Sequence, residues 1–218
     1  MKNVYFISVP IIVGIILGIY VTSNLVSDSI NDQSLLTNTQ LMKNGSPEMG
    51  LANAPISIVE FGDYQCTFCY KFHQNTLNQI KMEYIDTGKA NYIFRDFPLN
   101  GPDSVLVAEA SYCAGDQEKY WDYHVMLYEH QEGIDSGWAS NERLKSFAFT
   151  LDLDIDEFSH CLDSKKYYNQ VKLNLEKATG IGADRTPTFI LVNASGEQRQ
   201  IIGSQPYNVF EKVIESLL

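Results

Sequence analysis

The chain has 218 residues and a formal net charge of -11, because 27 acidic side chains outnumber 16 basic ones. This acidic balance argues against nucleic acid as a partner, since nucleic-acid-binding proteins carry a basic patch or stripe. The length and the hydrophobic fraction of 44% suffice for one domain with a substantial core.

The N-terminus begins with an apolar run, residues 4–21, which only one serine, one proline and two glycines interrupt. A run of this length reaches the lower limit for a helix that spans a bilayer. Lys2 precedes the run and acidic residues follow it, so the positive-inside rule keeps the N-terminus in the cytoplasm. Residues 1–26 are predicted to be a single-pass membrane anchor, with a cleaved signal peptide as the alternative. Either one exports the rest of the chain.

Residues 27–50 are rich in serine, asparagine, aspartate, glutamine and threonine, and they end near a Gly-Ser-Pro sequence at 45–47. This composition is typical of a flexible linker. The globular domain is therefore expected over residues 51–218.

Residues 56–62, Ile-Ser-Ile-Val-Glu-Phe-Gly, predict a buried strand, because β-branched and aromatic residues dominate them. An amphipathic helix is predicted directly after Cys66, since apolar residues recur there at a helical period. The residues that share one side of this helix are Cys69, Phe72, Leu77, Ile80 and Tyr84. Cys66 thus falls at the first turn, where unpaired N–H groups and the helix dipole lower the pKa of a thiol.

The pair Cys66 and Cys69 predicts a redox-active dithiol, because the thiolate is the species that attacks a disulfide. The spacing alone leaves two alternatives. The pair could be half of a zinc site. It could also be a structural disulfide, although so short a loop would stabilise the fold only weakly.

Residues 90–97 predict a second strand that ends before Pro98. Strand, helix and strand in this length indicate a parallel unit with a right-handed crossover. Asp103 or Ser104 is expected to cap the next helix.

A block of helices is predicted over about 103–180. Its members are 104–114, 118–131, 141–150, 155–163 and 165–179. Strands return at 188–192 and 198–202 around a turn, and a helix over 207–217 ends the chain. The predicted fold class is α/β, with a sheet that the helical block interrupts in sequence.

Five segments carry a resemblance to a known family. They are Glu-Phe-Gly-Asp-Tyr-Gln-Cys at 60–66 with Cys69, Phe-Arg-Asp-Phe-Pro-Leu at 94–99, Tyr-Trp-Asp-Tyr-His at 120–124, Phe-Ser-His-Cys-Leu-Asp-Ser at 158–164, and Thr-Pro-Thr-Phe at 186–189. In this order they resemble the DsbA-like thiol–disulfide oxidoreductases. The resemblance implies a thioredoxin-like fold with a helical insertion, here preceded by a transmembrane helix.

The resemblance implies that Cys66 is the nucleophile and Cys69 the resolving thiol. Thr67 and Phe68, the residues between them, set how many N–H donors reach the Cys66 sulfur and border the client site. Relatives often carry proline in place of Thr67. The dithiol carries the electrons, so no organic cofactor is expected.

The resemblance further implies a cis bond between Thr186 and Pro187, beside the two cysteines. Thr186 would then expose its backbone to an extended client segment, which adds to the sheet as a strand. An ordinary trans proline is the alternative. Arg185 stands where relatives commonly carry glycine, so it is expected to affect client preference.

Similar proteins place an acidic group beneath the resolving cysteine, and Glu60 is the matching residue. It is expected to shuttle the proton of Cys69; an outward-facing, solvated side chain is the alternative.

Cys113 and Cys161 are expected to form a structural disulfide, since relatives often have cysteines at both places. Two unpaired thiols are the alternative. His124 is interpreted as a packed core residue.

The sequence thus predicts a membrane-tethered, extracytoplasmic enzyme that exchanges disulfides with exported, cysteine-containing client proteins. A membrane redox partner would reoxidise it. The first alternative is a reductase or isomerase of the same fold. The second is a module that binds zinc or copper(I) through Cys66 and Cys69, and only this alternative needs a metal. The third is a client-binding protein whose redox site is incidental.

Overall fold

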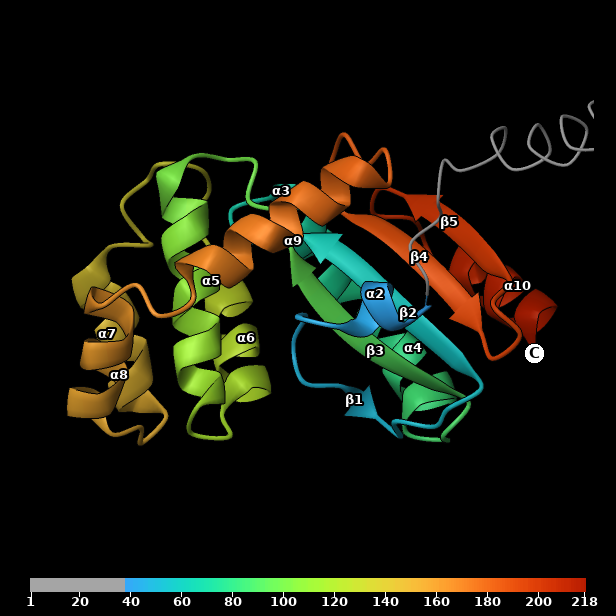
Figure 1. Ribbon diagram of the computed structural model, residues 1–218, viewed down its shortest axis with the longest axis horizontal. Helices are drawn as coiled ribbons and strands as arrows, with labels where there is room; N and C mark the ends of the chain where they lie inside the picture. The colour runs from blue at the N-terminus through green and yellow to red at the C-terminus, as the bar shows by residue number, and fades with distance from the viewer. Residues whose placement is uncertain (1–37) are drawn as a thin grey trace, which may run out of the picture. The chain divides into compact units, whose positions relative to one another are not determined.

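The structure, a computed structural model, describes residues 38–218 (Figure 1). Its strands are β1 (Met49–Gly50), β2 (Ile56–Gly62), β3 (Ala90–Asp96), β4 (Thr188–Asn193) and β5 (Gln198–Ile202). Its helices before β4 are α2 (Asn38–Met42), α3 (Thr67–Phe72), η1 (His73–Leu77), α4 (Asn78–Ile80), η2 (Lys81–Ile85), α5 (Pro102–Gly115), α6 (Tyr120–Glu129), α7 (Asn141–Thr150), α8 (Ile155–Asp163) and α9 (Tyr168–Gly180). The C-terminal helix is α10 (Tyr207–Leu217).

The strands form one sheet in the order β1-β3-β2-β4-β5. β2 and β3 are parallel, with Ile58 opposite Tyr92, while the other neighbouring pairs are antiparallel. Every residue of β2 and β3 is buried. These two central strands are therefore covered on both faces, which explains why they lack the apolar-polar alternation of a half-exposed sheet.

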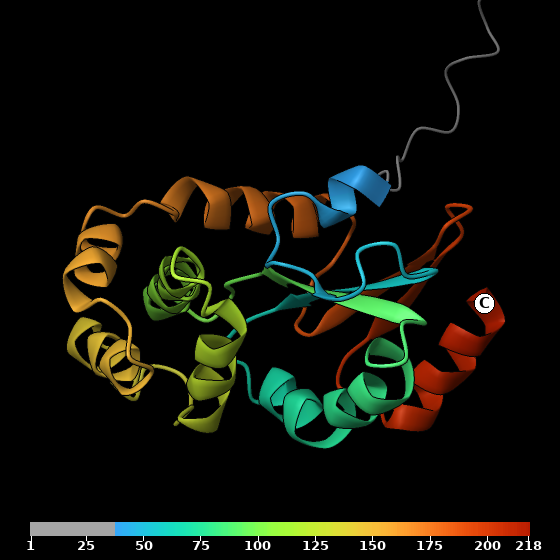
Figure 2. The same ribbon diagram turned by 90° about the horizontal axis from the view of Figure 1, so that it is seen from below.

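Helices cover the two faces in separate layers (Figure 2). The segment from α3 to η2 and helix α10 lie on one face, and α9 and α2 lie on the other. Successive residues of β2 point to opposite faces. Ile58 accordingly belongs to the main core with Phe72 and Phe210, and Phe61 to a smaller core with Ala178 of α9. By the same alternation Glu60 faces the α3 side.

The helix that follows Cys66 runs without a break from α3 to η2 and contains two π-helical turns, η1 and η2. The five apolar residues predicted to share one side of it are all buried, from Cys69 to Tyr84. Phe72 and Leu77 are five positions apart, which a regular α-helix would place on different sides. A π turn absorbs the extra residue and keeps both in the core.

The helical insertion, α5 to α8 with the start of α9, forms a second layer beside the sheet (Figure 1). The bounds of α7 and α8 agree with the sequence prediction. The predicted cap of α5 is wrong: Gly101 occupies the N-cap and Pro102 the first turn. Gly101 has a φ of 95°, which side chains rarely tolerate, and proline is favoured at a first helical position because its missing N–H is not needed there.

The predicted linker 27–50 is wrong for its last part. Residues 38–42 form α2, and β1 pairs with β3 through Met49 and Tyr92. Leu41 is 1% exposed within the smaller core, and the Arg95 guanidinium donates to the carbonyls of Gln40 and Leu41. The burial of Leu41 and the hydrogen bonds from Arg95 of β3 thus fix α2 against the domain, although this segment has the composition of a linker.

The predicted membrane anchor, residues 1–26, lies outside the described residues. Within residues 38–218, none of the helices has the length and apolar character needed to cross a membrane.

Candidate active site

The turn between β2 and α3 is held by the carboxylate of Asp63. Its Oδ1 accepts hydrogen bonds from the Gln65 backbone N–H and the Ser104 hydroxyl. Its Oδ2 accepts from the backbone N–H groups of Leu99 and Asn100. Asp63 is 2% exposed. One buried carboxylate therefore joins the turn to the loop that follows β3, and so fixes where α3 begins.

Cys66 is the N-cap residue of α3, with an extended backbone. Its side chain is 8% exposed, and its Sγ lies 3.4 Å from the Thr186 carbonyl oxygen. The pKa of the Cys66 thiol is lowered to about 6. The main cause is a hydrogen bond from the Cys69 thiol, followed by the Thr186 side chain and the backbone N–H groups of Cys69 and Phe68. The thiolate of Cys66 is thus the stable form at neutral pH.

Cys69 is fully buried one turn further along the helix. Burial raises the pKa of its thiol well above the usual value, and the hydrogen bond to Cys66 and the charge of Glu60 raise it further. Both cysteines are free thiols in this structure. The pair is therefore asymmetric: the pKa of the slightly exposed Cys66 thiol is lowered, and that of the fully enclosed Cys69 thiol is raised.

The Thr186–Pro187 peptide bond is cis. The antiparallel register sets Thr188 opposite Phe61, so the start of β4 runs beside the end of β2 and the cysteine turn. Arg185 is exposed and pairs with Asp184, its Nε lying 2.7 Å from Oδ1. Phe68 is 59% exposed between the two cysteines. Of the predicted client-facing residues, Thr186 thus contacts the Cys66 sulfur, while Phe68 and Arg185 are exposed next to Cys66 and Thr186 in the chain.

Glu60 is 0% exposed, so the alternative of a solvated, outward-facing side chain is wrong. The Tyr92 hydroxyl donates to its Oε2, and the His73 Nε2 lies 3.4 Å from the same oxygen. A Cβ added at Gly62 would lie 2.8 Å from Oε1, so this oxygen points toward the backbone beneath the cysteine turn. The lack of a side chain at position 62 leaves the room that the carboxylate occupies.

Several residues of the site carried no signal in the sequence analysis. Gln131, in the loop after α6, donates from Nε2 to the carbonyls of Tyr64 and Cys66. His73 and His124 lie 3.4 Å apart by their Nδ1 and Nε2 atoms, although 51 positions separate them. Contacts between the sheet layer and the insertion depend on how the two pack together, which residue spacing does not encode.

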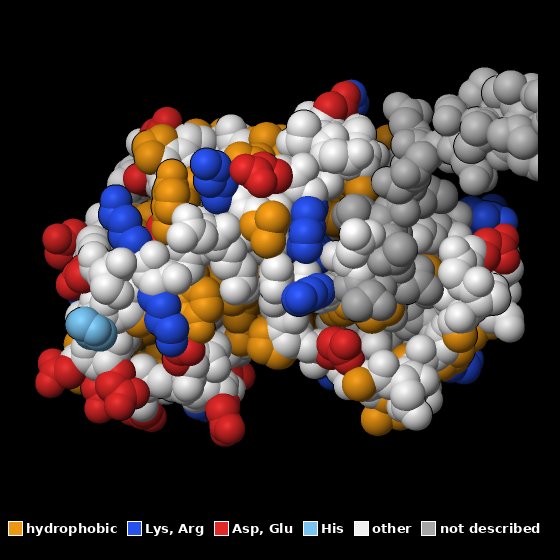
Figure 3. All heavy atoms as spheres, viewed as in Figure 1, with side chains coloured by type: hydrophobic (Ala, Val, Ile, Leu, Met, Phe, Trp, Pro, Cys, Tyr) orange, Lys and Arg blue, Asp and Glu red, His pale blue; other side chains and the backbone are white. Residues whose placement is uncertain are grey.

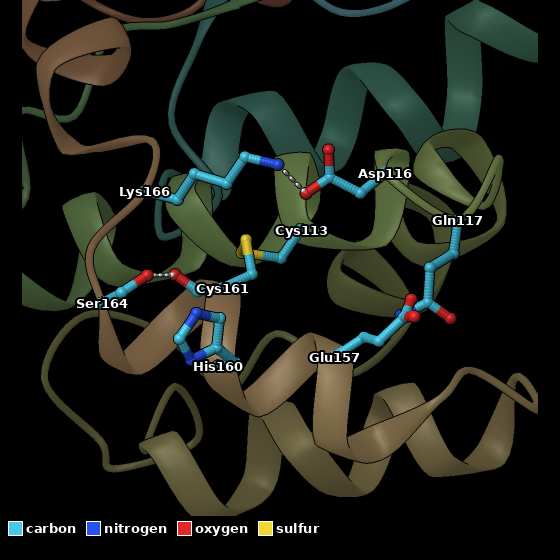
Figure 4. Close-up of a pocket in the computed structure, with 8 residues that line it drawn as sticks. All are labelled: Cys113, Asp116, Gln117, Glu157, His160, Cys161, Ser164 and Lys166. Carbon is cyan, nitrogen blue, oxygen red and sulfur yellow. Dashed lines mark hydrogen bonds and ion pairs between the residues drawn. A yellow bond between two sulfur atoms is a disulfide. The ribbon is translucent and has the colours of Figure 1, made fainter.

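The other two cysteines form a disulfide between α5 and α8, with an S–S distance of 2.02 Å and a sequence separation of 48. A cavity of about 610 Å³ opens beside it (Figure 4). Its lining residues are Cys113, Asp116, Gln117, Glu157, His160, Cys161, Ser164 and Lys166. Lys166 and Asp116 form an ion pair of 2.7 Å across it. None of the lining residues belongs to the turn that carries Cys66.

Acidic side chains gather over α7 and α8 on the face that Figure 3 shows. Asp154 caps α8 by accepting from two backbone N–H groups, and Asp156 and Glu157 lie in its first turn. Carboxylates at these positions complement the positive end of the helix dipole. Part of the acidity of the chain is therefore explained by helix capping.

Among residues 38–218, no group of three or more histidine, cysteine and acidic side chains is arranged to hold a metal ion. Cys66 and Cys69 come together with Glu60 and the Thr186–Pro187 segment instead. This arrangement is suited to thiol–disulfide exchange, because it offers one reactive thiolate, a second sulfur within reach, and a nearby carboxylate.

Comparison with known proteins agrees with this arrangement. A family model described as thioredoxin matches residues 43–216. The probable disulfide bond formation protein D of Bacillus anthracis is 29% identical over 196 residues, covering 88% of this chain and 86% of that protein.

Two solved structures are similar to the protein over most of their length. The oxidised form of BdbD from Bacillus subtilis has a TM-score of 0.72 and 25% identity, covering 79% of this chain and 92% of that one. The α-DsbA1 protein of Wolbachia pipientis has a TM-score of 0.71 and 28% identity, covering 86% and 96%. The chain therefore belongs to the thioredoxin family, within which it is a DsbA-like thiol–disulfide oxidoreductase.

Proposed function

We propose that the protein is a membrane-tethered, extracytoplasmic oxidase that donates the Cys66–Cys69 disulfide to exported client proteins. One observation carries the proposal: hydrogen bonds hold the pKa of Cys66 at about 6, beside a Cys69 thiol that stays protonated. A stabilised thiolate favours the reduced protein, and a dithiol that is stable when reduced is a strong oxidant. This asymmetry supports the donation of disulfides to clients, rather than the reduction or isomerisation of disulfides that clients already contain.

The reaction proceeds in two displacements. A client thiolate attacks the Sγ of Cys66 in the oxidised protein, and the Cys66–Cys69 bond breaks. The sulfur of Cys69 leaves with the electron pair and takes up a proton. A second client thiolate then attacks the client sulfur of the mixed disulfide, and Cys66 leaves as a thiolate. The client gains a disulfide, and the protein keeps two electrons on its two sulfurs.

The client is proposed to lie along Thr186, whose carbonyl is 3.4 Å from the Cys66 sulfur. An extended segment at this edge would place its own cysteine next to Cys66, and main-chain contacts would make binding tolerant of client sequence. Phe68 and Arg185 border the same place and would contact client side chains. No organic cofactor enters the scheme, because the dithiol itself carries the electrons.

The apolar run 4–21 supports the tether, and Lys2 before it supports an outward-facing domain. A membrane partner that accepts the two electrons would restore the disulfide, and the tether would hold the domain near it. Full activity of a form that lacks residues 1–26, in the absence of any membrane component, would contradict this part of the proposal.

A thiol-trapping titration of the full chain in glutathione buffers of graded poise, read by intact mass, tests the direction. We expect a Cys66–Cys69 potential of roughly -180 to -120 mV, as in disulfide donors. A potential near about -270 mV, as in thioredoxin, would instead support a reductase. Stoichiometric zinc or copper in the purified protein, lost in Cys66→Ser, would support the metal-binding alternative.

A further inference from the structure

A row of buried polar side chains leads from Glu60 into the helical insertion. The His73 Nε2 lies 3.4 Å from the Glu60 Oε2, and the His73 Nδ1 lies 3.4 Å from the His124 Nε2. The His124 Nδ1 is 2.8 Å from the Tyr64 hydroxyl, which is 3.4 Å from the Tyr120 hydroxyl. None of these five residues is more than 9% exposed. We call them the Glu60 chain.

Packing alone does not account for the Glu60 chain. Buried polar atoms cost free energy unless each one finds a partner, and a catalytic role is one of the explanations for an atom that stays unpaired. Within the described residues, Glu60 Oε1 and His73 Nε2 have no well-aligned hydrogen-bond partner. Both orphaned atoms lie at the end of the chain that approaches the cysteines. Hydrogen bonds of catalytic groups are often long in a resting site and shorten when charge develops.

The donors in the Glu60 chain can be assigned from chemistry. An ionised carboxylate only accepts, so His73 presents its Nε2–H to Glu60 and keeps a lone pair on Nδ1. His124 must then donate from Nε2, and its Nδ1 accepts from the Tyr64 hydroxyl. The Tyr64 oxygen in turn accepts from Tyr120. Every donor of the Glu60 chain is therefore directed toward Glu60, as is the Tyr92 hydroxyl, and the contact from His73 Nε2 is the one that is not a well-aligned hydrogen bond.

Glu60 approaches the resolving thiol through the backbone that follows β2. The Glu60 Oε1 points at Gly62, and the next residue, Asp63, makes a backbone hydrogen bond to the Cys69 sulfur. The charge of Glu60 also acts on Cys69 directly. The Glu60 Oε1 and the Cys69 thiol therefore both lie next to the backbone of residues 62–63.

We propose that His73, His124 and Tyr64 are positioning residues that hold the Glu60 carboxylate ready to exchange a proton with Cys69. The inference rests on the role given to Cys69 under the proposed function. When Cys69 resolves a mixed disulfide, its proton passes to Glu60, and its thiolate attacks the Cys66 sulfur. The Cys66–Cys69 bond forms, and the client sulfur leaves with the electron pair. In the reverse direction the released Cys69 thiolate recovers the proton.

Ionisable groups pack around His73 from every neighbouring element. They are Glu60 on β2, Cys69 on α3, Tyr92 on β3, and His124 and Tyr128 on α6. Tyr64, in the cysteine turn, contacts His124 behind them. Burial raises the pKa of the three tyrosines and lowers that of His124, so these four stay neutral near pH 7. None of these four groups therefore contributes a titration near pH 7 to the pH profile of the site.

The test separates the two steps of exchange. The reduced full chain is mixed with oxidised glutathione, quenched with acid and read by intact mass, at several pH values. Attack by Cys66 is bimolecular and forms the mixed disulfide, while attack by Cys69 is unimolecular and resolves it. For Tyr64→Phe we expect resolution at pH 7 to slow by about tenfold, because a hydrogen bond to a charged network contributes roughly that factor. Its pH profile should move upward, and the rate of mixed-disulfide formation should stay unchanged.

Two further variants make the result decisive. Tyr120→Phe removes the last hydroxyl of the Glu60 chain and should slow resolution by only about two- to threefold. It carries the test if Tyr64→Phe does not fold. Tyr123→Phe is the matched control, because its buried hydroxyl donates to the Leu144 carbonyl at 2.8 Å and does not belong to the chain. It should lose stability and keep both rates.

If Tyr64→Phe and Tyr120→Phe both fold and both keep the wild-type resolution rate and pH profile, the proposal is overturned. An equal loss of rate in Tyr123→Phe would also overturn it, since that would indicate a purely structural effect. Because the measurement uses glutathione and follows only the resolving step, a low Cys66–Cys69 potential would contradict the proposed oxidase and leave this inference standing.

Discussion

The two cysteine pairs of the protein occupy opposite ends of helices. Cys66 is the N-cap of α3, whereas Cys113 and Cys161 lie in the last turns of α5 and α8. The first pair is present as free thiols, and the second as a disulfide. The positive end of a helix dipole stabilises a thiolate, and the negative end destabilises it.

This difference shows how one side chain serves two purposes in one chain. At Cys66, several donors stabilise the sulfur anion, so the reduced state is favoured and the bond is readily exchanged. Cys113 and Cys161 lie in the last turns of their helices, where the negative end of the dipole destabilises a thiolate, so the reduced state is not favoured there. Position on the helix, rather than cysteine itself, determines which pair is reactive.

The largest expected effect comes from substitutions in the reactive pair, which test whether that pair alone transfers disulfides. Cys66→Ser should lower the rate of disulfide transfer to a reduced two-cysteine peptide by at least about 10³-fold, as removal of a nucleophile does in other enzymes. Cys69→Ser, mixed with oxidised glutathione, should instead accumulate a mixed disulfide at Cys66, visible by non-reducing mass analysis, because the Cys66 thiolate displaces one glutathione thiolate and no second thiol resolves the product. Residual transfer by Cys66→Ser through Cys113 would show that the second pair is also reactive.

The second pair should matter for stability instead. Replacing both Cys113 and Cys161 by alanine opens a link over 48 residues, which should lower the free energy of unfolding by about 4 kcal/mol. Urea unfolding measures this loss, and the potential of Cys66–Cys69 serves as its control. A shift of that potential by more than about 30 mV, roughly 1.4 kcal/mol, would contradict the separation of roles.

The sequence was informative where a single element determines the outcome. The strand 56–62 and the helices 141–150 and 155–163 have the predicted bounds, since β-branched runs and N-cap residues are local signals. The position of Cys66 at the start of a helix follows from the same kind of signal. Together with the resemblance, this sufficed for the fold class and for the two sulfurs.

The sequence was uninformative where two distant segments meet. Residues 38–50 have a linker composition, and their order depends on Leu41 entering a core and on Arg95 capping α2. The pairing of His73 with His124 depends on the packing of α6 against the sheet layer. Neither contact has a period or motif, so only the assembled fold reveals it.

The pH dependence of stability should distinguish the two pairs next. The pKa of Cys66 is about 6 in the folded reduced protein against an ordinary value near 9. Because the folded value is the lower one, the stabilisation is fully present above pH 9 and is lost as the pH falls through 6. At pH 8 the reduced form should gain about 2–3 kcal/mol relative to pH 5, at which almost none remains.

Thermal or urea unfolding of the reduced and oxidised forms at both pH values measures this gain. The oxidised form, in which Cys66 cannot ionise, is the control and should lack that increment. Selective reduction must leave Cys113–Cys161 intact, which intact mass after alkylation verifies. An equal pH response of the two forms would mean that the Cys66 thiolate is not stabilised.

A smaller effect is expected from filling the space at Gly62 that the Glu60 carboxylate occupies. Gly62→Ala would place a methyl group 2.8 Å from the Glu60 Oε1 and closer still to the Phe94 ring, so it should cost about 1–3 kcal/mol of stability. It should also slow resolution by Cys69. The matched control is Gly180→Ala in α9, where nothing lies within 4 Å. Equal effects of the two substitutions would contradict a special role for Gly62.

The smallest effect concerns charge at the rim of each pair. Arg185 adjoins Thr186 and is exposed beside Asp184, and Lys166 pairs with Asp116 over the Cys113–Cys161 disulfide. Arg185→Ala removes one positive charge near Cys66, so it should slow transfer to an acidic peptide and speed transfer to a basic one. Each change should be about two- to threefold at low salt and should disappear at high salt, as exposed charges predict.

Lys166→Ala makes the same change of charge beside the other pair and should leave both peptide rates unaltered. This contrast separates charge at the client site from the net charge of the molecule, because the two variants have equal net charge. Equal shifts in both variants would mean that the overall field steers clients to the protein. A shift in Arg185→Ala alone would place clients beside the Thr186 segment, next to the one sulfur that the helix N-terminus stabilises.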